Sequence, residues 1–359
     1  MTPTQHRIQL IAQVCQHPAL VNLMGSIHAH DLTAWLEAEL GHADALDTFV
    51  PNGPLKSKAI PPESLLHIVS GNTPHAAMQS LLRGLLLGSH NIMKLPSTGL
   101  PELQEWTDSF PQELKEKTSL HKKLTNTEWM SYNAVIAIGS DATIADIQKR
   151  ILPHQIFIPH GHQLSIGIVY SDFETAAPLA ARDISLFNQR GCLSPHAIYV
   201  EAEHATNFAA LLAHAMETFA QAHPPEPLSL SEAGAVRNLR ETTRFATAST
   251  HTTLLWESSN NLDWTVVYEQ HSQLKPSCLN RCVYVHPLPH EINLETLGSH
   301  AKHLSTIALH PFDEEVAKNL TTLPAHRICP LGQSQEPSLH WHHDGFAPLA
   351  SLVSWKDIG

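Results

Sequence analysis

The chain has few residues of the kinds that define several common protein classes. Of its 359 residues only five are cysteine, an odd number without the spacing of a disulfide-stapled scaffold. The 22 Lys and Arg residues are outnumbered by 34 Asp and Glu, and a formal charge of -12 argues against a general nucleic-acid-binding surface. No apolar run is long enough to cross a bilayer, and no signal peptide is recognisable at the N-terminus. We therefore expect a soluble, cytoplasmic protein.

Hydrophobic residues, in contrast, make up 42% of the chain, which is enough for a sizeable core, and the length suits two domains. Histidine is unusually common at 27 residues, so the net negative charge should shrink in mild acid. We interpret the histidines as a compositional bias of a solvated surface, with pH sensing as the alternative.

Short apolar runs alternate with helix-like segments through the first half of the chain. After two or three helices in residues 5–50 and a proline-rich connector at 51–63, strands are expected at residues 66–70, 91–95, 134–138, 156–158 and 164–170. A helix from Pro74, with Thr73 as its N-cap and Gly88 as its stop, separates the first two strands. Strand, helix and strand within about thirty residues form a βαβ unit, which implies a parallel sheet of the nucleotide-binding kind.

The α/β pattern continues beyond residue 166. The expected elements are helices at 175–188, 204–222 and up to Arg244, and strands at 197–200, 264–268, 283–286 and 304–309. One cysteine, Cys192, directly follows a glycine between a helix and a strand of this part. A thiol at such a turn can be exposed at the floor of a cleft, where its thiolate acts as a nucleophile. On this pattern alone an inert cysteine remains the commoner outcome.

Four loops follow strands of the first half: Gly71-Asn72-Thr73-Pro74, Lys94-Leu95-Pro96-Ser97, Gly139-Ser140-Asp141 and Gly161-His162-Gln163. In a parallel sheet such loops gather at one edge, where ligands bind. A helix that opens after Gly139-Ser140 can direct backbone N–H groups at a pyrophosphate, and Lys94 can meet a phosphate or ribose as a compact cation. The usual Gly-x-Gly-x-x-Gly fingerprint is absent.

In their order these segments resemble the aldehyde dehydrogenase superfamily, and more closely its LuxC-type acyl-CoA reductase branch. The most specific parts are Gly191-Cys192-Leu193-Ser194-Pro195 and the tail Trp341-His342-His343-Asp344-Gly345. The resemblance also runs through residues 70–74, 91–97, 138–140, 161–165 and 183–189. It implies an α/β, aldehyde dehydrogenase-like fold with a Rossmann-like cofactor domain plus an α/β catalytic domain that carries the cysteine.

The resemblance also implies how the chain is divided. We expect a helical N-terminal segment and nucleotide-binding α/β domain at residues 1–165, a catalytic α/β domain at 166–335, and a tail at 336–359 that packs back on the body. The superfamily resemblance further suggests a homo-oligomer.

The same resemblance implies roles for single residues. Cys192 matches the nucleophile that attacks the acyl thioester, and Asn72 matches the residue whose amide stabilises the oxyanion together with the Cys192 backbone N–H. Lys94 matches the cofactor lysine, and Gly139 and Ser140 match the turn beside the pyrophosphate. Ser97, with Thr98, stands where NAD-using relatives often have an acidic residue. A small residue leaves space for a 2′-phosphate, so we expect NADPH, with NADH as the alternative.

One departure from the superfamily is informative. Where hydrolytic aldehyde dehydrogenases have Glu-Leu-Gly-Gly, this chain has Pro159-His160-Gly161-His162. The glutamate that would activate water is absent, which fits a reductase, although His160 or His162 acting as a base stays open. The resemblance thus implies NAD(P)H-dependent reduction of a fatty acyl-CoA to the aldehyde through a Cys192 thioester. The donor could also be an acyl carrier or a partner enzyme that transfers the acyl group. The alternatives are an oxidative aldehyde dehydrogenase and a non-catalytic acyl- or partner-binding relative.

Several other patterns have simpler interpretations. The histidine-rich run 340–344 is not favoured as a metal site, and we expect no metal. Cys278 and Cys282 would share one face of a helix and serve packing, while Cys15 and Cys329 are expected to be buried. The helical spacing of Arg237, Arg240 and Arg244 fits either a solvated helix face or, less favoured, a basic stripe for CoA phosphates.

Overall fold

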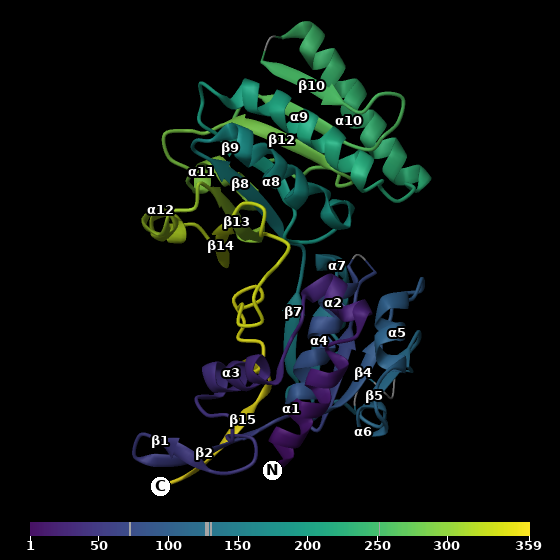
Figure 1. Cartoon of the computed structure of the whole chain (residues 1–359), viewed down its shortest axis with the longest axis vertical. Helices are drawn as coiled ribbons and strands as arrows, with labels where there is room; N and C mark the ends of the chain where they lie inside the picture. The colour runs from purple at the N-terminus through teal and green to yellow at the C-terminus, as the bar shows by residue number, and fades with distance from the viewer. Residues whose placement is uncertain (72, 126–128, 130, 251) are drawn as a thin grey trace. The chain divides into compact units, whose positions relative to one another are not determined.

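The computed structural model describes residues 1–71, 73–125, 129, 131–250 and 252–359, and the chain forms two compact units. Unit 1 comprises Met1–His162 together with Ser338–Gly359, and unit 2 comprises Gln163–Pro337. Figure 1 colours the chain by residue number and shows the C-terminal segment running with the elements of unit 1. The two units are described separately below.

A parallel sheet forms the centre of unit 1 (Figure 1). Its strands are β3 (Ser64–Ile68), β4 (His90–Lys94), β5 (Thr118–His121), β6 (Ala134–Ile138) and β7 (Ile156–His160). They lie in the order β5-β4-β3-β6-β7, and each neighbouring pair is parallel. In chain order this is 3-2-1-4-5, the arrangement of the first five strands in dinucleotide-binding sheets. The predicted nucleotide-binding α/β class is confirmed for this unit.

The sequence predicts two or three helices near the N-terminus, and the structure has three of them there, α1 to α3. The described helices are α1 (Pro3–Val14), α2 (Pro18–Met24), α3 (Ala29–Leu40), α4 (Pro74–Leu87), α5 (Pro101–Asp108), α6 (Gln112–Lys115) and α7 (Asp141–Gln148). Helix α4 is buried over most of its length, and it begins after Thr73 and ends at Gly88, as predicted. Gly84 allows its close approach to the sheet, because an added Cβ would lie only 1.8 Å from Asn91 Oδ1 of β4.

The prediction of a proline-rich connector at residues 51–63 is wrong for most of these residues. The strands β1 (Val50–Asn52), β2 (Leu55–Ile60) and β15 (Ser354–Ile358) form a small antiparallel sheet there in the order β1-β2-β15. Pro51 is tolerated because β1 is an edge strand, where a missing N–H breaks no ladder. Ser57 Oγ of β2 donates a hydrogen bond to Asp357 Oδ1 of β15, so the last residues of the chain are tied to residues near its start.

Unit 2 is built on a larger sheet. Its strands are β8 (Leu164–Val169), β9 (Pro195–Val200), β10 (Thr253–Glu257), β11 (Thr265–Glu269), β12 (Cys282–Pro287), β13 (Leu304–His310) and β14 (Arg327–Pro330). Their order is β10-β11-β12-β9-β8-β13-β14, and all pairs are parallel except β10 with β11. The sequence did not predict β10 or β14.

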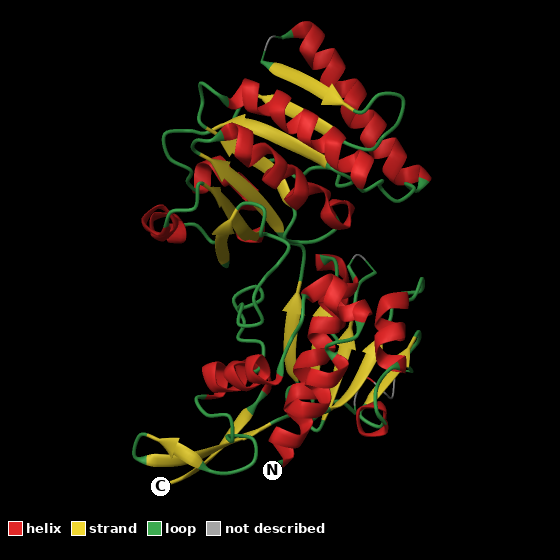
Figure 2. Cartoon of the chain, in the orientation of Figure 1, coloured by secondary structure: helices red, strands yellow, loops and turns green. Residues whose placement is uncertain are grey.

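Helices cover both faces of this sheet (Figure 2). The helical segments are α8 (Phe173–Ser185), η2 (Leu186–Gln189), α9 (Ala205–Ala222), α10 (Leu230–Ser249), α11 (Leu294–Leu297), η3 (Gly298–His303), α12 (Glu314–Asn319) and η4 (Leu320–Thr322). Ile198 of β9 packs into the core formed with α8 and α9, whereas its neighbour Tyr199 packs into the opposite core. A strand that is buried on both faces is typical of a covered parallel sheet. No described helix is both long and apolar enough to span a membrane.

Candidate active site

The strand order of unit 1 identifies the edge of its sheet at which a ligand is expected. Connections leave β3 toward β4 on one side, whereas β6 lies on the other side of β3. At such a switch point two loops diverge beyond the carboxyl ends of the strands, and this opening is the usual ligand site of an open α/β sheet. The loop after β3 begins at Gly71, and the loop after β6 is Gly139-Ser140. Both were among the predicted cofactor loops.

The structure brings most of the predicted cofactor residues to this edge. Lys94 is the half-buried last residue of β4, and Ser97 is exposed in the loop that follows. An added Cβ at Gly71 would lie 3.5 Å from both Pro96 Cβ and Thr98 Oγ1, so the loops after β3 and β4 are in contact. Asn72, the predicted oxyanion donor, lies outside the described residues.

Gly139 and Ser140 form the turn into α7. Ser140 is the helix N-cap, and its Oγ accepts a hydrogen bond from the Thr143 N–H at 3.3 Å. The carboxylate of Asp141 is turned toward the next loop along the edge, where Oδ1 accepts the His162 N–H at 2.7 Å. A positive helix end and a glycine backbone suit an anionic group such as a phosphate.

In unit 2, Cys192 occupies a turn between η2 and β9. The thiol-bearing residue is half-buried, and its carbonyl oxygen accepts a hydrogen bond from Ser165 Oγ of β8 at 2.8 Å. Before it, Phe187, Asn188 and Gln189 have φ values of 52, 51 and 62°, a left-handed conformation that non-glycine residues adopt at a cost of about 1 kcal/mol each. Such strain persists only where the surroundings hold the backbone firmly.

Hydrogen bonds from the Gln189 side chain fix much of this backbone. Its buried amide Nε2 donates to the carbonyl oxygens of Pro195 and Cys282, each at 2.8 Å, and its Oε1 accepts the Cys282 N–H at 2.9 Å. The side chain therefore closes the Cys192 turn from its first residue to the start of β9. It also joins the turn to β12.

A second set of buried contacts supports the turn from the other side. Gln335 Nε2 donates to Ser194 Oγ at 2.7 Å and to the carbonyl oxygen of Asp183 at 3.2 Å. The Asp183 carboxylate accepts the backbone N–H groups of Gly332 and Ser334. The prediction named Ser165, Asp183 and Gln189 only as parts of family-like runs, and it missed Gln335. No local signal in the sequence marks Gln335, because its contacts come from distant segments.

A buried histidine cluster lies in unit 1. His160, His343 and Asp344 bring three possible metal-ligand atoms within 4.8 Å of one another in the described chain. His160 Nδ1 donates to Asp344 Oδ2 at 2.8 Å, and the two imidazole rings stack with centroids 3.8 Å apart. The cluster joins the end of β7 to the C-terminal segment.

The hydrogen bonds of this cluster argue against a metal. Arg83 Nη2, which can only donate, lies 3.3 Å from His343 Nδ1. His343 Nδ1 is then the acceptor, and Nε2 carries the proton toward Asp344 Oδ2 at 3.6 Å. With this tautomer the Nδ1 lone pair of His343 is taken by Arg83, and the buried positive charge of Arg83 balances Asp344 without an ion.

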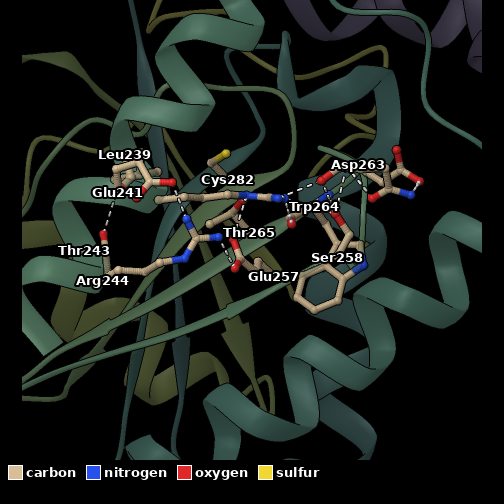
Figure 3. A network of polar contacts seen from close by, with 12 residues as sticks. Leu239, Glu241, Thr243, Arg244, Glu257, Ser258, Asp263, Trp264, Thr265 and Cys282 are labelled. Atoms are coloured by element: carbon tan, nitrogen blue, oxygen red, sulfur yellow. Dashed lines mark hydrogen bonds and ion pairs between the residues drawn. The ribbon is translucent and has the colours of Figure 1, made fainter. Parts of the chain in front are cut away.

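The solvated helix face favoured for the arginines of α10 is wrong for Arg240, and so is the alternative of a basic stripe. That guanidinium is buried and donates to Thr265 Oγ1, Ser258 Oγ and the carbonyl oxygens of Asn261 and Trp264, as the network in Figure 3 shows. Glu257 Oε2 lies 3.2 Å from Arg240 Nε, and Arg244 pairs with both Glu257 and Glu241. Neither Arg240 nor Arg244 is thus an unpaired cation for CoA phosphates.

Solved aldehyde dehydrogenases have the same fold. Glyceraldehyde-3-phosphate dehydrogenase GapN from Methanocaldococcus jannaschii, complexed with NADP, is 12% identical and aligns with a TM-score of 0.71 over 99% of this chain and 89% of its own. Aldehyde dehydrogenase C from Pseudomonas syringae, in complex with NAD+ and octanal, is 12% identical with a TM-score of 0.69 over 99% and 84%. At these identities the likeness shows the fold alone, and the predicted aldehyde dehydrogenase-like fold is confirmed.

Relatives found by sequence identify the family to which the chain belongs. The long-chain acyl-protein thioester reductase of Photorhabdus laumondii is 24% identical over 339 residues, which are 89% of this chain and 68% of the relative. The enzyme of the same name from Aliivibrio fischeri is 24% identical over 332 residues, 88% of this chain and 68% of its own. The profile of the family described as acyl-CoA reductase (LuxC) matches residues 4–355, nearly the whole chain. The protein belongs to the LuxC family of acyl-CoA reductases.

Proposed function

We propose that the protein reduces a long-chain acyl thioester to the aldehyde with NADPH, and that Cys192 holds the acyl group as an enzyme thioester. The observation that carries this proposal is the half-buried Cys192 turn, fixed by Gln189 and Ser165 in a chain of the LuxC family. A thiol that is partly exposed on a firmly held turn is suited to nucleophilic catalysis.

In the proposed reaction the Cys192 thiolate attacks the thioester carbonyl carbon. The oxyanion of the tetrahedral intermediate would accept a hydrogen bond from the Cys192 backbone N–H, and the family resemblance assigns the role of second donor to the Asn72 amide; one such donor is worth about 3–4 kcal/mol of barrier. Collapse of the intermediate breaks the carbon–sulfur bond to the donor, which leaves as a thiolate and takes a proton from solvent. NADPH, when bound, would supply the hydride that the acyl carbon on Cys192 needs, and Cys192 would leave as the thiolate when the aldehyde is released.

Residues at the switch point of unit 1 fit the cofactor. Gly139 and Ser140 would present the start of α7 to the pyrophosphate, and Lys94 would meet a ribose or phosphate oxygen. The exposed Ser97 adds no charge that would repel a 2′-phosphate. These observations support NADPH as the cofactor.

The acyl donor is proposed as a class. Relatives are named for acyl-protein thioesters, whereas the family is described by acyl-CoA. Both donors carry the acyl group on a sulfur atom. They differ only in the thiol that is released when the acyl group passes to Cys192. We therefore propose a long-chain acyl thioester, with acyl-CoA and acyl-protein as the two forms to compare.

The oxidative alternative is less well supported by unit 1. Pro159 stands where hydrolytic relatives have their glutamate, and the neighbouring His160 is buried, bonded through Nδ1 to Asp344 and stacked on His343. An imidazole enclosed in this way is poorly placed to activate water. Reduction of the acyl-enzyme needs no such base.

Intact-mass spectrometry after incubation with long-chain acyl-CoA or acyl-protein tests the proposal directly. We expect one acyl adduct on Cys192, lost on addition of NADPH as aldehyde forms. The Cys192→Ser variant should form no labile thioester, whereas Cys329→Ser, which removes a buried cysteine of the same unit, should behave like the wild type. An adduct that forms equally in the Cys192→Ser variant, or no adduct with any donor, would refute the proposal.

A further inference from the structure

A pocket of about 280 Å³ lies at the amino ends of neighbouring strands in unit 2. Its lining includes Asn188, Asp263 and Arg281, which belong to the segments that lead into β9, β11 and β12. These strands are adjacent and parallel, in the order β11-β12-β9, so the three segments meet at one edge of the sheet. Cys192 also directly precedes β9 and therefore lies at this same edge.

Part of the lining comes from a second left-handed segment. Residues 279–281 have φ values of 62, 54 and 60°. Because this segment separates Cys278 from Cys282, the two cysteines do not share a helix face, and the sequence-based expectation is wrong on this point. The Asn280 N–H donates to the carbonyl oxygen of Asn188 at 3.1 Å, which joins the segment to the left-handed residues before the Cys192 turn.

Three buried polar atoms at the pocket have no hydrogen-bond partner within the described chain: Asn188 Oδ1, Asn280 Oδ1 and Arg281 Nε. Their residues are only 8%, 4% and 4% exposed. Other atoms of two of these side chains are already held, since Asn280 Nδ2 donates to the Cys278 carbonyl oxygen at 3.4 Å and Arg281 Nη1 to that of His223 at 3.0 Å. Buried polar atoms are costly to leave unpaired, so these three indicate a partner from outside the chain.

The charges around the pocket favour a neutral partner. Its lining carries the carboxylates of Glu226 and Asp263 together with the guanidinium of Arg281. An anion would be repelled by the two carboxylates, and a cation by the guanidinium. Two unpaired acceptors and one unpaired donor instead match secondary amides, whose N–H groups donate and whose carbonyl oxygens accept.

Pantetheine, the arm that carries the thioester in CoA and in acyl carrier proteins, combines such amides with apolar groups. It has two secondary amides joined by methylene groups, and a carbon with two methyl groups near its far end. The remaining side chains of the pocket are apolar and suit those groups: Pro225, Pro227, Leu228 and Leu262. Asn188 is four residues from Cys192, so their Cα atoms are at most about 14 Å apart. An arm in this pocket can therefore start close to the proposed nucleophile.

We propose that this pocket holds the pantetheine arm of the acyl donor while the acyl group passes to Cys192, an inference that rests on the proposed function. Arg281 Nε donates to an amide oxygen of the arm, and the side-chain oxygens of Asn188 and Asn280 accept its amide N–H groups. No bond forms or breaks in the pocket. Its role is to position the thioester through groups that every pantetheine donor shares.

Binding is measured with N-ethylpantothenamide, which has both amides of the arm but neither its thiol nor a phosphate. Titration calorimetry with the Cys192→Ser variant, without cofactor, is expected to show one binding site. Adding Leu228→Trp, which fills the pocket, should abolish binding, whereas Leu230→Trp places the same ring at an exposed position outside it and should change nothing. Adding Arg281→Met removes the unpaired donor and should weaken binding by about tenfold or more. No binding to the parent, or equal affinity in Leu228→Trp, would overturn the proposal.

Further titrations identify the carrier of the arm. S-methyl-CoA and an acyl carrier protein with a methylated pantetheine thiol are compared on the Leu228→Trp and Leu230→Trp proteins. A donor whose affinity falls only in Leu228→Trp uses the pocket, and a fall for neither would refute its role. N-acetylalanine methylamide offers peptide amides alone, and binding as tight as that of N-ethylpantothenamide would show a peptide site instead. These measurements need no acyl transfer, so they can fail while the Cys192 adduct forms, and they can succeed if it does not.

Discussion

Asp183 is a buried carboxyl group whose contacts hold the C-terminal part of unit 2 against α8. It accepts backbone N–H groups of Gly332 at 2.7 Å and Ser334 at 3.2 Å. Burial nevertheless raises its pKa to about 6, because loss of hydration disfavours the charged form more than these hydrogen bonds favour it. Asp183 is therefore a group whose protonation state changes just below neutral pH.

This raised pKa predicts a pH dependence of stability. Since the folded state takes up the proton at a higher pH than the unfolded state, the stabilisation is fully present below the unfolded pKa of about 4 and is lost as pH rises through 6. The free energy of unfolding of unit 2, taken relative to Asp183→Asn, should rise by about 2 kcal/mol between pH 7.5 and pH 4.5. Urea titrations of both proteins measure this, and histidine titration cancels in the difference. A flat or opposite difference would contradict the expected sign.

Introducing a single negative charge at Ser97 tests whether the protein prefers NADPH to NADH. In Ser97→Glu a carboxylate would lie where a 2′-phosphate is proposed to bind, and like charges repel. We expect the affinity for NADPH to fall by about tenfold or more relative to NADH, which corresponds to about 1.4 kcal/mol. Fluorescence titration with both cofactors measures the ratio. Ser97→Ala should keep the wild-type preference, and an unchanged ratio in Ser97→Glu would place the 2′-phosphate elsewhere.

At the scale of elements, Arg240 fastens α10 to the edge of the unit 2 sheet. One side chain from the helix reaches the β10–β11 connection, the Thr265 hydroxyl of β11 and the Glu257 carboxylate of β10 (Figure 3). Strand β10 is the only antiparallel member of the described sheet and lies at its edge. The buried cation thus holds the outermost strand and the helix together.

Removing this side chain should loosen both elements. Arg240→Ala leaves several buried acceptors and Glu257 without their cation, so we expect a loss of about 3–5 kcal/mol in the free energy of unfolding of unit 2. Arg237→Ala, three residues earlier on the exposed side of α10, should change it by less than about 0.5 kcal/mol. Urea midpoints compare the two variants. Equal midpoints would mean that the Arg240 contacts contribute little.

Elements with a strong local pattern were predictable. The run Ala134-Val135-Ile136-Ala137-Ile138 is buried and uniform, and it forms β6 at those same residues. Strand β2 escaped prediction because prolines flank it and its pairing partner β15 lies near the other end of the sequence. The left-handed segments at 187–189 and 279–281 contain no glycine. Tertiary hydrogen bonds, not local preference, stabilise them.

For the candidate site, the sequence predicted more of the edge of unit 1 than of the Cys192 turn. Lys94, Gly139 and Ser140 follow recognisable strands, so a parallel sheet alone places them at one edge. The supports of Cys192 come from residues such as Ser165 and Gln335, which only the folded chain brings together. Residues that make polar contacts across such long sequence separations show no periodic pattern in the sequence from which the contacts could be predicted.

At the scale of the molecule, unit 1 is completed by residues 338–359. Asp344 brings a carboxylate to the buried Arg83, whose pKa burial lowers to about 10, and it receives the His160 ring N–H. Asp344→Ala should therefore destabilise unit 1 by about 3 kcal/mol or more while unit 2 is unaffected. Hydrogen exchange should become faster in α4 and β7 but not in β9 or β12. The exposed carboxylate Asp146, replaced by Ala, serves as the control and should change neither unit.

The pairing of β15 with β2 has a consequence for how the protein is made on a ribosome. Unit 2 is one continuous stretch of chain, so it can finish folding as soon as Pro337 has left the exit tunnel. Unit 1 starts first but is completed only after unit 2, since the strand that pairs with β2 and the Asp344 carboxylate near Arg83 are encoded after unit 2. During translation the first unit therefore waits with β2 open on one side, and with Glu39 but not Asp344 near the Arg83 cation, until residues 338–359 have been made.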